Sequence, residues 1–163
     1  MLAWTTAQTH ACTSGCCEPE VHTKAPCPLC GALGASVPAI TLESLLTPSA
    51  LRTIEGKTEG WHFCQTPACE AVYFQNASIL RQTHLRIPVG LKEGIRPAMV
   101  CYCFEWSIER MQEEIERQGY TQALDDIKHN MDTIGCDCSR RNPSGRCCLG
   151  DVKKAIERLA AHP

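Results

Sequence analysis

The sequence shows no excess of either charge and no long apolar run. Lys and Arg number 16 against 18 Asp and Glu in the 163 residues, so the chain lacks the basic excess that nucleic acid phosphates require. No apolar stretch approaches the roughly 20 residues of a membrane span, and the N-terminal segment MLAWTTAQTHA has no signal-peptide pattern. We therefore predict a cytoplasmic protein without membrane insertion or a nucleic acid partner.

The sequence also lacks the motifs of common enzyme active sites. It contains no recognisable nucleophile–base pair and no phosphate-binding loop. The acidic residues Glu113, Glu114 and Glu116 are typical of a solvated helix face. An enzyme is therefore the least expected answer, and an electron-transfer or metal-binding protein is favoured.

Cysteine, by contrast, is abundant, with 13 residues in the chain. Such a content indicates either disulfides or metal ligands. Disulfides require an oxidising compartment, and an odd number of cysteines would leave at least one thiol unpaired. Because no signal peptide is expected, we interpret the cysteines as metal-binding thiolates.

Two cysteine pairs in the first half have the spacing of a zinc ribbon. Cys27 and Cys30 lie in the knuckle sequence CPLCG, where Gly31 can adopt the positive φ that the turn needs. Cys64 and Cys69 form the second pair. The alternative, four unrelated thiols, leaves the paired spacing unexplained, so one zinc on four thiolates is favoured.

Short strands and a helix are predicted around these pairs. Strands are expected at 61–63, 71–74 and 85–89, with Pro88 placing the last one at a sheet edge. A short helix is expected at 41–46. His62 adjoins the second cysteine pair and is a candidate substitute ligand, although a surface or packing role is favoured.

The last third of the chain has a helical pattern. Apolar residues recur with helical spacing at 107–119, 122–134 and 151–161, and such stripes are more typical of core packing than of cofactor contact. Ser107 is placed to cap the first of these helices, and Gly119 to end it. The sequence NPSG at 142–145 predicts a turn.

Six cysteines bracket these helices and can converge at one end of them. The crowded C-x-C and C-C pairs suit a two-iron cluster better than zinc, and such a cluster takes four thiolates. Spacing alone does not decide which four of the six would bind. The six are Cys101, Cys103, Cys136, Cys138, Cys147 and Cys148.

Several segments resemble the N-terminal region of the iron-containing CopZ-type copper chaperones. They are CPLCG at 27–31, LESLL at 42–46, FCQTPACEAVYF at 63–74, VCYCFEW at 100–106 and NPSGRCCLGDV at 142–152. The resemblance extends from about residue 26 to the C-terminus. The C-terminal half is also similar to the small helical [2Fe–2S] fold of bacterioferritin-associated ferredoxin, although its second C-x-x-C is replaced here.

The resemblance implies an α+β fold in two domains. A zinc-ribbon-like β domain is expected at 26–98 and a small helical [2Fe–2S] domain at 99–163, after a flexible tail at 1–25. The zinc ligands that it implies are Cys27, Cys30, Cys64 and Cys69. The cluster ligands that we favour with it are Cys101, Cys103, Cys138 and Cys147, with Cys136 and Cys148 as alternates.

The expected N-terminal tail carries three more cysteines. Cys12, Cys16 and Cys17, with His10 beside them, offer soft donors suited to Cu(I) or Hg(II). The alternative is an unstructured segment with incidental thiols. The family continues into a copper domain with its own C-x-x-C site, which is not expected in a chain that stops at Pro163. We therefore favour the tail as a replacement soft-metal site, and copper delivery by the family's route is not carried over.

Three arginines lie between the candidate cluster ligands. Arg140, Arg141 and Arg146 could offset the negative charge of a thiolate-bound cluster and raise its reduction potential. A solvated basic loop is an equal alternative.

Together these observations predict a metal-handling redox protein with one zinc and one [2Fe–2S] cluster. One-electron transfer in the homeostasis of copper, or of another soft metal, is the favoured function, with Cu(I) as a further ligand and a redox or metal-transfer protein as partner. The alternative is a non-redox metal-binding, sensing or assembly module. In that case the cluster is structural and the N-terminal thiols bind Cu(I) or Hg(II).

Overall fold

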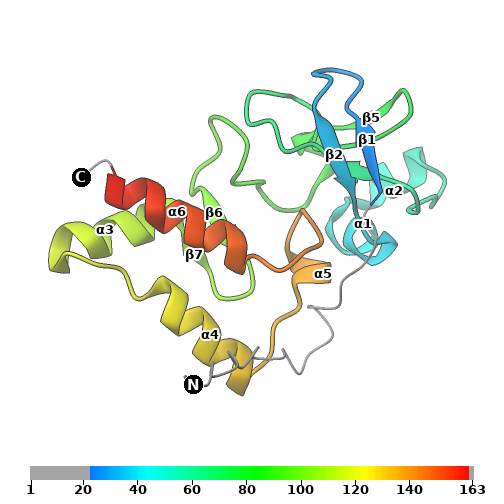
Figure 1. Cartoon of the computed structure of the whole chain (residues 1–163). Helices are drawn as coiled ribbons and strands as arrows, with labels where there is room; N and C mark the ends of the chain where they lie inside the picture. Colours follow the sequence, from blue (N-terminus) through cyan, green and yellow to red (C-terminus); the bar gives the residue numbers. More distant parts are fainter. Residues whose placement is uncertain (1–22, 162–163) are drawn as a thin grey trace, which may run out of the picture.

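The first half of the chain forms a small antiparallel sheet (Figure 1). The computed structural model describes residues 23–161, so Cys12, Cys16 and Cys17 lie outside the described residues. Five strands pair in sequence order: Lys24–Pro26 (β1), Leu33–Ser36 (β2), His62–Phe63 (β3), Tyr73–Gln75 (β4) and Ser78–Leu80 (β5). The strands expected at 61–63 and 71–74 thus correspond to β3 and β4. Lys24 and Ala25, placed in the tail by the sequence, lie in β1.

Two short helices pack on this sheet. Helix α1 (Ala39–Leu45) covers most of the helix expected at 41–46, and α2 (Pro48–Thr53) follows it directly. The second helix was not predicted, because Pro48 follows the helix expected at 41–46 and proline commonly ends a helix. Proline is compatible with the first helical position, and the Thr47 side chain caps this end by accepting the N–H of Ala50 at 3.2 Å. Leu42, Leu46 and Ala50 pack in one core with residues of β3 and β4.

The prediction of a strand at 85–89 is wrong. Leu85 makes only an isolated bridge with Leu46, just after a short 3-10 helix, η2 (Gln82–His84). The Gln82 side chain binds the following backbone instead: it donates to the carbonyl of Ile87 at 2.7 Å and accepts from the N–H of Val89 at 2.9 Å. These bonds satisfy backbone groups that a strand partner would otherwise have to satisfy.

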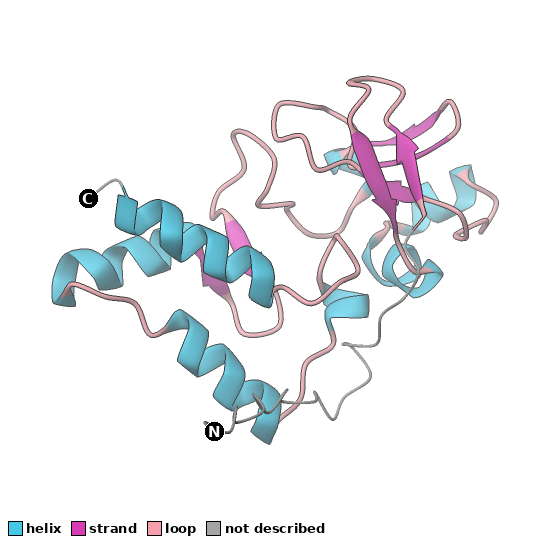
Figure 2. Cartoon of the chain, viewed as in Figure 1, coloured by secondary structure: helices cyan, strands magenta, loops and turns pink. Residues whose placement is uncertain are grey.

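The second half combines a short hairpin with helices (Figure 2). Strands Met99–Cys101 (β6) and Trp106–Ser107 (β7) pair with each other. The helices are Ile108–Gln118 (α3), Ala123–Thr133 (α4), Cys138–Arg141 (α5) and Leu149–Ala161 (α6). The three predicted helices correspond to α3, α4 and α6, with their ends shifted by no more than two residues. The hairpin and α5 were not predicted.

The predicted ends of α3 are confirmed. The Ser107 hydroxyl accepts the N–H of Arg110 at 3.2 Å, which satisfies one of the unpaired donors at a helix start. Gly119 ends the helix in the left-handed region, with φ at 85°. Trp106 is buried beside the start of α3, and its ring N–H donates to Asp126 at 2.7 Å. The Arg110 guanidinium lies over the Trp106 ring, 3.6 Å from the ring centre.

Two hydrogen bonds from buried side chains join the two halves. The Tyr73 hydroxyl in β4 donates to the carbonyl of Pro143 at 2.7 Å, and the Thr41 hydroxyl in α1 donates to the carbonyl of Ser139 at 2.6 Å. Helix α5 accordingly packs on α1 (Figure 1). The position of residues 138–143 is therefore set by the first half of the chain.

The predicted turn at 142–145 lies at this contact. The N–H of Gly145 donates to the carbonyl of Asn142 at 2.8 Å, and Gly145 has φ at 68°. A Cβ at Gly145 would lie 2.6 Å from Pro38 Cδ and 2.8 Å from the Thr41 hydroxyl. Only glycine allows the turn to approach α1 this closely.

Tyr73→Phe should test the connection between the halves. The change leaves the carbonyl of Pro143 without its donor at a buried site, which typically costs about 1–3 kcal/mol. We expect the free energy of unfolding in urea to fall by that amount. Tyr120→Phe is the matched control, because Tyr120 is 57% exposed. Equal stability of the two variants would show that the bond contributes nothing.

Candidate metal centres

Four cysteine sulfurs from the two knuckles meet at one point. The Sγ atoms of Cys27, Cys30, Cys64 and Cys69 all lie within 4.8 Å of one another. Two of these separations are 3.6 Å, between Cys30 and Cys64, and 3.9 Å, between Cys27 and Cys69. A tetrahedral Zn–S₄ site with bonds of about 2.3 Å has S···S edges of about 3.8 Å. The donor set and its spacing therefore fit zinc.

Backbone hydrogen bonds build each knuckle. In the first, the N–H of Gly31 donates to the carbonyl of Cys27 at 2.8 Å, and Gly31 has the positive φ, 72°, that the sequence predicted. In the second, the N–H of Cys69 donates to the carbonyl of Thr66 at 3.2 Å. Strands β1 and β2 carry the first knuckle, whereas the second follows β3. Pairing of β2 with β3 therefore brings the two knuckles together.

The four thiols differ in exposure and in acidity. Cys27, Cys64 and Cys69 are buried, whereas Cys30 is exposed. Burial raises the pKa of Cys69 to about 12 and also raises the pKa of Cys64. The Thr66 hydroxyl, 3.4 Å from Cys30 Sγ, is the main cause that lowers the pKa of Cys30 to about 6. A cation that binds here would therefore displace protons mainly from the buried thiols.

His62 has a packing role in this structure. Its ring stacks on Phe74, with ring centroids 5.6 Å apart, and its Nε2 lies 3.3 Å from the Thr23 hydroxyl. This agrees with the role that the sequence favoured over metal ligation.

A second group of thiols lies in the core of the helical half. Cys103 Sγ and Cys138 Sγ are 3.8 Å apart. Cys148 interacts with Cys101 and with Cys138 closely enough to shift the pKa of each, and Cys147 also acts on the pKa of Cys138. Five of the six predicted cysteines thus form one connected network at the start of α5 and α6. The sixth, Cys136, is half-buried and packs against the same core.

The thiols of this network have opposite pKa shifts. Hydrogen bonds from Cys101 and Cys138 lower the pKa of Cys148, and the bond from Cys138 lowers the pKa of Cys103. The same contacts raise the pKa of Cys101 and of Cys138. A soft cation that binds here would replace the protons shared within the network, because thiolates are its ligands.

The three arginines of the sequence prediction have different surroundings. Arg141 lies close enough to Cys103 for its charge to contribute to the lowered pKa of that thiol. Arg140 forms an exposed ion pair with Asp137, with 3.5 Å between nitrogen and oxygen. Arg146 lines a surface cleft. The sequence did not distinguish the three, because the short helix α5, which contains Arg140 and Arg141 but not Arg146, was not predicted.

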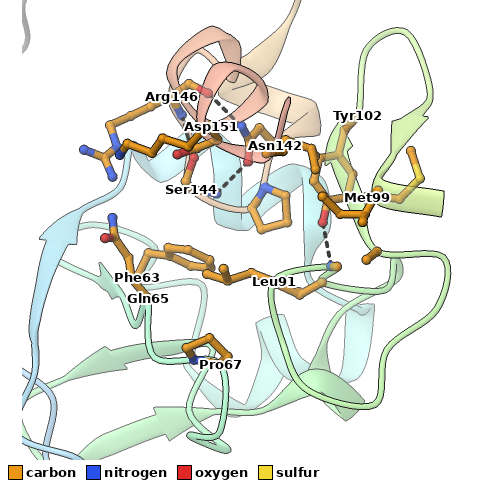
Figure 3. Close-up of a pocket in the computed structure, with 18 of the residues that line it drawn as sticks. Phe63, Gln65, Pro67, Leu91, Met99, Tyr102, Asn142, Ser144, Arg146 and Asp151 are labelled. Atoms are coloured by element: carbon orange, nitrogen blue, oxygen red, sulfur yellow. Dashed lines mark hydrogen bonds between the residues drawn. The ribbon is translucent and has the colours of Figure 1, made fainter. Parts of the chain in front are cut away.

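The cleft lies between the two halves, with a volume of about 470 Å³. Figure 3 shows Asn142, Ser144 and Arg146 on one side, and Phe63, Gln65 and Pro67 on the other. Phe63 and Gln65 flank Cys64, and Arg146 precedes Cys147, so the cleft adjoins both thiol groups along the chain. The sequence carried no signal for it, because its lining comes from segments far apart in the chain.

No helix within residues 23–161 is long and apolar enough to cross a membrane.

Three comparisons relate the chain to known proteins. A family model for the CopZ zinc binding domain matches residues 24–86. The copper chaperone CopZ of Archaeoglobus fulgidus is 31% identical over 143 residues, which cover 82% of this chain and 67% of that protein. The X-ray structure of its N-terminal domain superposes with a TM-score of 0.66 at 30% identity, and the match covers 80% of this chain and 96% of that domain. The first half is therefore a zinc-binding domain with a cysteine cluster suited to a metal.

Replacing one knuckle cysteine should remove the metal of this domain. Cys27→Ser is expected to lose one zinc per chain and to lower the thermal midpoint by about 10 °C or more, because a structural metal contributes several kcal/mol. Metal analysis and calorimetry would measure both effects. Cys136→Ser, in the helical half, is the control and should keep the full zinc content. Retention of zinc by Cys27→Ser would exclude Cys27 as a ligand.

Proposed function

The chain belongs to the CopZ family of copper chaperones, and from this membership we propose that it is a metal-handling redox protein. It holds one zinc in the first half and one [2Fe–2S] cluster in the second, and it transfers one electron in copper homeostasis. The observation that carries this proposal is the connected network of thiols in the helical core, separate from the four knuckle thiols.

Zinc is assigned to Cys27, Cys30, Cys64 and Cys69. A full set of four thiolates leaves no open position on the ion, which is typical of a structural rather than a catalytic zinc. Three of the four sulfurs are also part of a small core with Ala71 and Phe74. The zinc would therefore hold the β domain together, over about residues 26–98, and would not bind a substrate.

Four thiols of the second group are assigned to the cluster. Each iron needs two sulfurs close together, and the network provides two such pairs: Cys103 with Cys138, and Cys101 with Cys148. The sequence favoured Cys147 and kept Cys148 as an alternate. Cys148 is favoured here, because it is 2% exposed and interacts with two other thiols, Cys101 and Cys138, which lower its pKa. Cys147 is the runner-up, through its contact with Cys138.

A [2Fe–2S] cluster in this pocket would supply one-electron transfer. Four thiolates around the oxidised core leave a charge of −2, and reduction makes it −3, so nearby cations favour the reduced state. The electron would come from a redox partner protein and would convert Cu(II) to Cu(I), the copper ion that soft thiolates bind. The helical cluster domain would then extend over about residues 99–163.

A second candidate function is a non-redox metal-binding or assembly module. The observation that favours it is the burial of Cys101, Cys138 and Cys148, which are 0%, 2% and 2% exposed and pack with Met111 and Ile127. Ligands at the centre of a core can hold a cluster whose role is to stabilise the packing of the helices and not to transfer electrons. The two candidates differ in whether the cluster survives reduction.

Anaerobic reconstitution decides between them. We expect one zinc, two irons and two sulfides per full-length chain. Reduction with dithionite should give a rhombic S = 1/2 EPR signal. Addition of an oxidant in the absence of air should restore the spectrum of the oxidised cluster. A cluster that is lost on reduction would support the non-redox module. Zinc at both sites without sulfide would contradict the redox proposal.

The same measurement on cysteine variants tests the ligands. Cys148→Ala should lose the iron and sulfide while keeping the zinc, whereas Cys136→Ala should keep all three. If Cys147→Ala loses the iron and Cys148→Ala does not, Cys147 is the fourth ligand.

Arg141→Ala should lower the midpoint potential of the cluster. Removal of this positive charge destabilises the more negative reduced state, by on the order of 20 mV because the arginine is exposed and screened by water. Arg140→Ala is the matched control, since Arg140 is paired with Asp137. A redox titration with equal potentials for both variants would show that Arg141 does not act on the cluster.

A further inference from the structure

Lys92 is a buried lysine beside the knuckle thiols. Its residue is 7% exposed, and it is the one charged residue among those buried in the described part of the chain. The ammonium group donates to the carbonyls of Cys64 and Thr66, both at 2.9 Å. These carbonyls belong to the second knuckle. A lysine is almost never buried without a compensating charge, so its surroundings must supply one.

The four knuckle cysteines are the nearby source of negative charge. Burial lowers the pKa of Lys92, and the charges of these cysteines oppose that lowering, with Cys64 contributing most among them. Zn²⁺ with four thiolates carries a net charge of −2. With the Lys92 ammonium included, the net charge of the centre and its surroundings is −1. The smaller net charge lowers the free-energy cost of burying the centre in a low-dielectric interior.

We propose that Lys92 is a fixed counter-charge of the zinc centre, and that it holds the metal by making the thiolates less nucleophilic. This inference rests on the zinc assignment made above. Metal-bound sulfur is already a thiolate, and the intrinsic nucleophilicity of a thiolate falls as nearby positive charge stabilises its electrons. The exposed sulfur, Cys30, is where an electrophile or a competing soft metal would attack first. Lys92 is thus a positioning residue that makes the centre retain its zinc instead of passing it on.

The charge can be separated from the two hydrogen bonds by substitution. Lys92→Gln removes the charge but keeps an amide N–H₂ that can donate to the carbonyls. Lys92→Arg keeps the charge with a different shape. Lys57→Gln is the matched control, because Lys57 is on the surface and pairs with Glu55.

Two readouts on the full-length chain test the proposal. The first is zinc release during treatment with iodoacetamide, followed with a colorimetric zinc indicator. Lys92→Gln should release zinc roughly three- to tenfold faster than the wild type, while Lys92→Arg and Lys57→Gln stay close to it. The second is the thiolate-to-cobalt charge-transfer band after exchange of zinc for Co²⁺. It should move to longer wavelength in Lys92→Gln alone, a shift that a purely structural role would not produce.

The outcomes separate this inference from the zinc assignment. A wild-type chain that shows no thiolate–cobalt band would overturn the zinc assignment and the inference with it. Suppose that the wild type shows the normal band, and that Lys92→Gln has the same rate of zinc release and the same band as the wild type. That result would overturn the inference alone. Equal zinc release and equal bands in Lys92→Arg and Lys92→Gln would also overturn it. If Lys92→Gln does not fold, Lys92→Arg decides the question. A Lys92→Arg variant that folds and behaves like the wild type supports the requirement for a positive charge at this position. A Lys92→Arg variant that does not fold contradicts that requirement.

Discussion

Four cysteine sulfurs within 4.8 Å of one another are the constraint on which the rest of the structure depends. As thiolates they would repel, so the arrangement needs either a cation among them or protons on the buried members. Three of these cysteines are also core residues that pack with Ala71 and Phe74. The charge balance at the site is therefore a condition for the packing of the whole sheet, and under the proposal made for Lys92 its ammonium group, bound to the Cys64 carbonyl, contributes to that balance.

The sheet in turn positions the helical half. Strand β4 follows the second knuckle and carries Tyr73, whose hydroxyl binds the carbonyl of Pro143 just before the last two cysteines. Helix α1 holds α5 through Thr41 and Ser139. The two thiol groups therefore belong to separate cores, but the backbone that carries part of the second group is anchored on the first half.

The sequence predicted the features that depend on local spacing. Paired cysteines identified both thiol groups, and apolar periodicity with Ser107 and Gly119 located a helix almost to the residue. It did not predict contacts made by single side chains across the fold. Gln82 replaces a strand partner, and Lys92 reaches a knuckle 26 residues or more earlier in the chain; neither belongs to a repeating pattern. Neighbouring cysteines also look alike in sequence, so the burial of Cys148 became visible only in three dimensions.

The anchoring of α5 on α1 has a consequence for how the protein matures. Cys138 is the first residue of α5, so one sulfur of the second group is presented by a helix that the zinc-binding half supports. Under the proposed function, the β domain must fold around its zinc before the iron pocket is complete. Newly made chains would then acquire their metals in a fixed order, and a cell short of zinc would accumulate chains that are poor substrates for iron–sulfur assembly even when iron is plentiful.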